Sequence, residues 1–154
     1  MLLRSRDGKS VETKIVGYEY PDKAPDPDES GQWDANWLFI EAKSKGADSD
    51  WRFAAPCMLT MEAETLYQWL LAIERRSAEP ELGFMEPELS FEILEYALSY
   101  AKLQVVHHVY DRFAKEYVHF PVILELTYDD LKQAAVDWYA EIQRFPARYR
   151  KSTL

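Results

Sequence analysis

The sequence has little cysteine, little glycine and no long apolar run, and each shortage excludes a class of protein. Cys57 is the single cysteine, so no disulfide can form within the chain, and we expect a reducing compartment. There are five glycines in 154 residues, and the glycine motifs that cradle phosphates or present a nucleophilic serine are missing. No apolar stretch approaches the roughly 20 residues that span a bilayer, and MLLRSRDGKS has no signal-peptide core. We therefore expect a cytoplasmic protein without such an active site.

Basic residues are also scarce. Lys and Arg total 18 against 27 Asp and Glu, which gives a net charge of −9 and a pI of about 4.8. Nucleic acids and anionic membranes both select basic surfaces, so we expect neither as a partner. The charge is uneven, because residues 1–140 carry 14 basic and 26 acidic residues, a net −12, whereas residues 141–154 carry +3.

Hydrophobic periodicity predicts an α+β fold. Runs rich in β-branched and aromatic residues predict strands at 1–4, 11–20, 36–43, 51–57, 82–86, 89–96, 98–110 and 117–126. Apolar residues at helical spacing predict two amphipathic helices at about 61–76 and 128–145, capped by Thr60 and Thr127. Short links between strands favour a mainly antiparallel sheet of about seven to eight strands packed with these helices. We expect one domain over 1–146 and a basic tail over 147–154.

The last two strands face each other across the turn DRFAKE. Pairing Tyr110 with Tyr117 predicts one apolar face for the core and one wetter face. The predicted core face consists of Leu103, Val105, His107, Val109, Val118, Phe120, Val122 and Leu124. On the wetter face the same register places His108 opposite His119, and Pro121 suggests an edge strand because it cannot donate a ladder hydrogen bond.

His108 and His119 are the candidate metal ligands of the sequence. Two imidazoles and a nearby carboxylate can bind zinc, but no third ligand stands at a diagnostic spacing. We therefore expect no metal and no cofactor.

Acidic residues gather in the loop 21–34 and in the segment 74–95. The loop lacks the bidentate Glu of a calcium-binding loop, because Trp37 stands at the twelfth position counted from Asp26. A solvated face explains such acids; a surface that attracts a basic partner is the sharper hypothesis. The residues assigned to that surface are Asp22, Asp26, Asp28, Glu29, Trp33, Asp34, Glu79, Glu81, Glu86 and Glu88.

Five stretches resemble one family. They are GYEYPD at 17–22, DANWLFIEAK at 34–43, WRFAAPCMLTMEAETLYQWL at 51–70, LGFMEPELSFEIL at 82–94 and FPAR at 145–148. Together the chain resembles the WapI-like immunity proteins, which are small acidic bacterial proteins that neutralise the toxin domain of a large polymorphic toxin.

The resemblance implies a non-enzymatic protein that binds a cognate toxin inside the producing cell. Because many such toxins are nucleases with a basic groove, it implies a basic, nuclease-type partner. A small-molecule or metal-binding α+β domain and a non-catalytic adaptor are the alternatives. The sequence leaves open the identity of the toxin, the surface that binds it and the oligomeric state.

Overall fold

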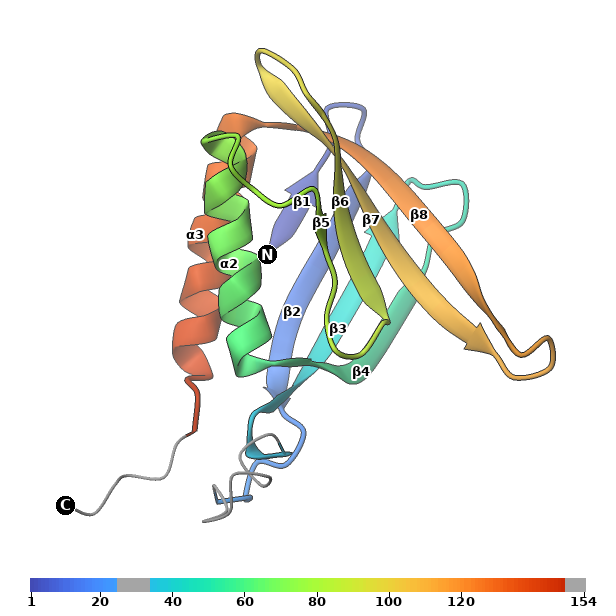
Figure 1. Cartoon of the computed structure of the whole chain (residues 1–154), viewed down its shortest axis with the longest axis vertical. Helices are drawn as coiled ribbons and strands as arrows, with labels where there is room; N and C mark the ends of the chain where they lie inside the picture. Colours follow the sequence, from blue (N-terminus) through green and yellow to red (C-terminus); the bar gives the residue numbers. More distant parts are fainter. Residues whose placement is uncertain (25–33, 149–154) are drawn as a thin grey trace.

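A computed structural model describes residues 1–24 and 34–148, and this part of the chain forms two four-stranded antiparallel sheets and two helices (Figure 1). The first sheet has the order β1 (Leu2–Arg4), β2 (Ser10–Tyr18), β3 (Trp37–Lys45), β4 (Arg52–Leu59). The second has the order β5 (Glu81–Leu82), β6 (Leu89–Tyr96), β7 (Tyr100–Asp111), β8 (Glu116–Thr127). The helices are α2 (Thr60–Glu74) and α3 (Tyr128–Arg144). The predicted α+β class, the eight strands and the two helices are confirmed.

The two sheets meet where β1 and β8 lie side by side. The backbone N–H of Arg6 donates to the Glu125 carbonyl at 3.1 Å. The Glu125 N–H in turn donates to the Ser5 hydroxyl at 2.9 Å. The edge strands of both sheets are therefore joined along this short stretch, and the sheets open away from it.

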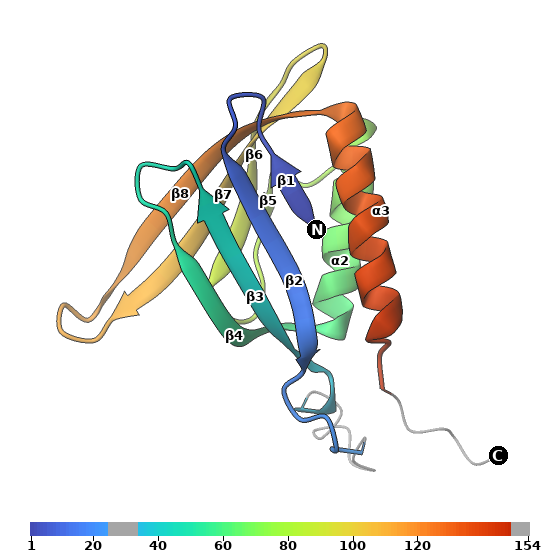
Figure 2. The same cartoon turned by 180° about the vertical axis from the view of Figure 1, so that it is seen from behind.

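The two helices lie beside each other along one flank of the strands, as both views show (Figure 2). Each turns a stripe of apolar side chains to the core, as its 3.6-residue periodicity requires. Trp138 of α3 is fully buried and its indole N–H donates to the Ala63 carbonyl of α2 at 2.8 Å, which fixes the helix pair. Neither helix is long and apolar enough to cross a membrane, as far as the described residues go.

The predicted register of the β7–β8 hairpin is confirmed along its whole length, from Tyr100 opposite Thr127 to Asp111 opposite Glu116. The predicted core face is buried only in its inner half. Val109 and Val118 are 40% and 39% exposed, because the end of the hairpin projects beyond the rest of the molecule (Figure 1). Pro121 lies on an edge strand, as predicted.

The strand predicted at 82–86 is present only as β5, and its predicted end is wrong because pairing stops at Leu82. The chain leaves the sheet there because the Met85 N–H donates to the Glu62 carboxylate of α2 at 2.6 Å instead of to a strand.

The start and end of the first helix also differ from prediction. Leu59, not Thr60, is the residue before α2, and its N–H donates to Glu62 at 2.9 Å. Arg75 and Arg76 follow the helix rather than occupying its last turn, and Arg76 has a φ of 55°. Thr127 caps α3 as predicted, accepting from the Asp130 N–H at 3.1 Å.

A polar junction at one end of the molecule is centred on Asn36, which is buried. Its side-chain oxygen accepts from the Arg148 N–H at 2.7 Å and from the Thr60 hydroxyl at 3.2 Å, and its amide donates to the Arg148 carbonyl at 3.0 Å. The Arg148 guanidinium reaches the carbonyls of Tyr20 and Pro21 at 2.9 Å each and lies 3.5 Å from the centre of the Tyr18 ring. Asn36 thus holds the start of β3, the start of α2 and the chain after α3 together.

Replacing Asn36 with alanine should lower the free energy of unfolding by about 1–3 kcal/mol, because it leaves buried hydrogen-bonding groups without partners. Urea unfolding followed by circular dichroism measures the change. Gln143→Ala, on the exposed side of α3, is the control and should change it by less than about 0.5 kcal/mol. Equal effects of the two substitutions would contradict the role of the junction.

Candidate functional site

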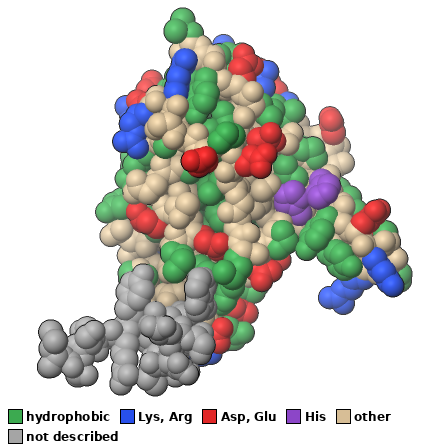
Figure 3. Space-filling view, in the orientation of Figure 1, with side chains coloured by type: hydrophobic (Ala, Val, Ile, Leu, Met, Phe, Trp, Pro, Cys, Tyr) green, Lys and Arg blue, Asp and Glu red, His purple; other side chains and the backbone are tan. Residues whose placement is uncertain are grey.

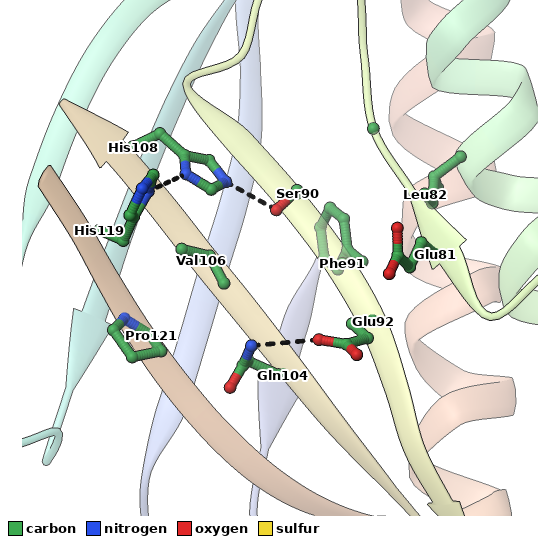
Figure 4. A pocket seen from close by; sticks show the side chains of 11 residues that line it. Glu81, Leu82, Ser90, Phe91, Glu92, Gln104, Val106, His108, His119 and Pro121 are labelled. Carbon is green, nitrogen blue, oxygen red and sulfur yellow. Dashed lines mark hydrogen bonds between the residues drawn. The ribbon is translucent and has the colours of Figure 1, made fainter. Parts of the chain in front are cut away.

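A hollow of about 430 Å³ lies on the outer face of the second sheet. Its floor comes from β6, β7 and β8 and one wall from β5 (Figure 4). Figure 3 shows this face, with acidic side chains spread over it and the histidines where the hairpin leaves the body. Polar groups converge on the hollow from all four strands, which is the usual build of a binding site.

A chain of hydrogen bonds crosses one end of the hollow. The Ser90 hydroxyl and His108 Nε2 are 2.7 Å apart, and His108 Nδ1 and His119 Nδ1 are also 2.7 Å apart (Figure 4). The confirmed hairpin register produces the histidine pair, because it sets the two residues directly opposite each other. Only one of the two facing Nδ1 atoms can carry the proton of their hydrogen bond, so one imidazole donates and the other accepts.

The pKa of His108 lies below its usual 6.5 for three reasons: its partial burial, then the neighbouring His119, then His107. Each disfavours the charged imidazolium. His107 itself is buried against β6, with Nδ1 2.9 Å from the Glu88 carbonyl. Because a carbonyl only accepts, His107 carries its proton on Nδ1.

Carboxylates dominate the other end of the hollow. Glu81 and Glu92 are directly opposite each other in the β5–β6 ladder, so their side chains leave the sheet on the same side. Gln104, the next residue across the sheet, donates to Glu92 at 3.2 Å. Two like charges in this position destabilise a sheet unless a cation lies between them.

The cation that would offset these charges is missing from the described residues. No ion pair within 4.0 Å involves Glu79, Glu81, Glu86, Glu88 or Glu92 in 1–24 and 34–148. On the outer face of the first sheet, by contrast, Glu12 pairs with Lys43 at 2.8 Å and Glu41 with Arg52 at 2.8 Å. The sequence explains the difference in part, because residues 77–101 contain neither Lys nor Arg.

A second hollow, of about 360 Å³, lies where the hairpin projects over the β5–β6 loop. Glu86 and Glu88 line it together with rings from β4, β7 and β8. It shares His108 with the first hollow, so the two are neighbours on one face.

The structure divides the predicted partner surface. Glu81 lines the first hollow, and Glu86 and Glu88 line the second. The carbonyl of Glu79, just before β5, accepts from the Trp69 indole at 2.8 Å. Three of these four predicted residues therefore line the two neighbouring hollows, and Glu79 lies just before β5.

The other predicted residues lie elsewhere. Asp34 is paired with Lys23 at 2.7 Å, and Asp22 is exposed in the same loop, near the Asn36 junction. Asp26, Asp28, Glu29 and Trp33 lie outside the described residues. Of the described residues of the loop 21–34, neither Asp22 nor Asp34 lines either hollow.

Several residues of the site were missed from sequence. Glu92 and Gln104 were not assigned to the partner surface, although the alternation of Glu92 with Phe91 and Ile93 predicts that it points away from the apolar face, and the hairpin register predicts Gln104 on the wetter face. Ser90 needed the pairing of β6 with β7, which the sequence did not supply.

The described residues offer neither a set of three metal ligands nor a reactive cysteine. The predicted approach of His108 and His119 is confirmed, but no group of three His, Cys, Asp or Glu side chains in the described part of the chain could hold a metal ion. Burial, together with the nearby carboxylates of Glu88, Glu62 and Glu86, raises the pKa of Cys57 to about 12, so its thiol stays protonated at neutral pH.

Acidification should cost stability through His108. Its folded pKa is below the unfolded 6.5, so as the pH falls below 6.5 the unfolded chain takes up a proton that the folded chain resists. The free energy of unfolding should therefore fall between about pH 7.5 and 5.5, and His108→Gln should lose less of it. An NMR titration of the His108 ring checks the cause directly, and a midpoint at or above 6.5 would contradict it.

No curated protein and no solved structure matches the chain. The model of the family described as "Immunity protein WapI-like family" matches residues 1–146. The chain therefore belongs to the WapI-like immunity protein family.

Proposed function

We propose that this chain neutralises a basic toxin domain by binding it with the outer face of the second sheet. The observation that carries the proposal is the run of unpaired carboxylates from Glu79 to Glu92, in a protein whose first sheet pairs its acids with its own cations. The carboxylates of Glu81 and Glu92 lie opposite each other and repel when no cation is near. A cation from a partner would remove this repulsion and be attracted by both.

The chemistry of the described residues supports inhibition by binding rather than by catalysis. A protonated Cys57 cannot act as a nucleophile. An acidic protein blocks a nuclease-type toxin by occupying or covering the basic groove that holds the nucleic acid. The same charge attracts the toxin from a distance and raises the association rate.

The proposed place of action is the cytoplasm of the toxin-producing cell. A single buried cysteine suits a reducing compartment. There the protein meets the toxin domain before it is exported.

Co-expression with the toxin domain encoded beside this gene tests the function itself. Cells that carry both genes should survive, and cells that carry the toxin domain alone should die. If the toxin domain kills cells equally with and without this protein, the proposed function is wrong.

Neutralising Glu81 and Glu92 together, as Glu81→Gln with Glu92→Gln, tests the surface. The association rate with that toxin domain should fall about threefold to tenfold, and its dependence on salt should flatten. Folding should be kept, because the change removes a like-charge pair. Stopped-flow mixing at several salt concentrations gives both quantities.

Asp48→Asn with Glu64→Gln is the matched control, since it removes the same two charges from exposed positions outside both hollows. If control and test variants slow association equally, net charge rather than this face attracts the toxin.

A further inference from the structure

The hollow beneath the projecting hairpin carries a charge that the described residues leave unsatisfied. Glu88 lines this hollow of about 360 Å³, and its Oε2 atom is buried without a hydrogen-bond partner. The carbonyl of the same residue accepts from the His108 N–H at 3.0 Å and lies 2.9 Å from His107 Nδ1. The residue is therefore held in place by its main chain while its carboxylate lacks a counter-charge.

Aromatic rings line the same hollow as this carboxylate. Phe53 of β4 stacks on His107 with ring centres 4.5 Å apart. Tyr110 and Tyr117, a pair across the hairpin with ring centres 5.2 Å apart, line the same hollow and are 50% and 46% exposed. Large exposed rings beside a buried acid are typical of a protein contact rather than of a solvated loop.

No element within residues 1–24 and 34–148 covers these tyrosine rings. The hairpin projects, so its outer half has no packing partner in the described residues, and its turn carries Phe113 in full exposure. A partner that covers exposed apolar groups of this kind removes their surface from water, and this burial stabilises the complex.

We propose that an arginine side chain of the toxin enters this hollow and is the anchor of the complex. This deepens the proposed function, on which it rests. A guanidinium is flat and always charged, so it stacks on the tyrosine rings while its N–H groups reach the Glu88 carboxylate. Glu86, at the rim, adds attraction before contact. A lysine ammonium matches the charge but not the flat shape of such a site.

A small probe tests the hollow without the toxin. The probe is N-acetyl-arginine amide, added to the isotope-labelled full chain and followed by NMR. It should bind with a dissociation constant in the millimolar range and shift the signals of Glu88, Tyr110 and Tyr117. N-acetyl-citrulline amide, which has nearly the same shape without the charge, should not. Binding of N-acetyl-lysine amide as tight as that of the arginine probe, or no binding of the arginine probe, would overturn the assignment.

Variants separate the charge from the fold. Glu88→Gln keeps the size of the side chain and should abolish the shifts, whereas Glu64→Gln, the same change on an exposed position of α2, should leave them intact. Tyr117→Phe should retain binding, because the ring remains, and Tyr117→Leu should lose it. Thermal melting of each variant confirms the fold; binding by a folded Glu88→Gln equal to wild type overturns the proposal.

The toxin domain gives the final comparison. Glu88→Gln should weaken its complex by about 30-fold or more relative to Glu64→Gln, because a buried charge pair is broken. If the wild-type protein protects cells and the Glu88→Gln variant binds the toxin as tightly as the wild type does, the proposed arginine anchor is wrong and the proposed function stands. If wild-type protein fails to protect, the proposed function is wrong, whatever the probe does.

Discussion

The short seam between β1 and β8 is the constraint on which the rest of the molecule depends. Bonds among Ser5, Arg6 and Glu125 join the edge strands of the two sheets near the carboxyl end of β8. The inner half of the β7–β8 hairpin is thereby held over the core, and the outer half has no sheet to pack on. A long hairpin fixed at one end must project, and the projection creates the hollow beneath it and the face beside it (Figure 1).

Charge is arranged differently on the two sheets. In the first sheet Glu12 pairs with Lys43 and Glu41 with Arg52, and at one end of the second sheet Lys102 lies near Glu95 and Glu125. The stretch from Glu79 to Glu92 has no such pairs in the described residues, and the opposed Glu81 and Glu92 give up some sheet stability. Unfavourable features that persist in an otherwise consistent fold are typical of functional sites. Here they are electrostatic, and they suit a partner of opposite charge.

The stretches that resemble the family largely meet at the Asn36 junction. GYEYPD supplies Tyr18 and the carbonyls that Arg148 of FPAR binds, and Thr60 ends the CMLT run that contacts Asn36. These residues hold β3, α2 and the chain after α3 together, so their role is in the fold. The stretch LGFMEPELSFEIL at 82–94 is the exception, because it carries Glu86, Glu88 and Glu92, which are proposed to contact the toxin.

The sequence by itself determined the elements and one register. Alternation and helical spacing act between near neighbours, so they predicted the strands, the two helices and the pairing of His108 with His119. Tertiary structure alone decided which acids share a surface, where the predicted strand 82–86 ends and how far the hairpin projects. Each of these depends on contacts between distant residues, such as Met85 with Glu62 and Glu125 with Ser5. A charge count gives the amount of acid in a chain, but the counter-charges that neutralise it come from strands and helices that only folding brings close.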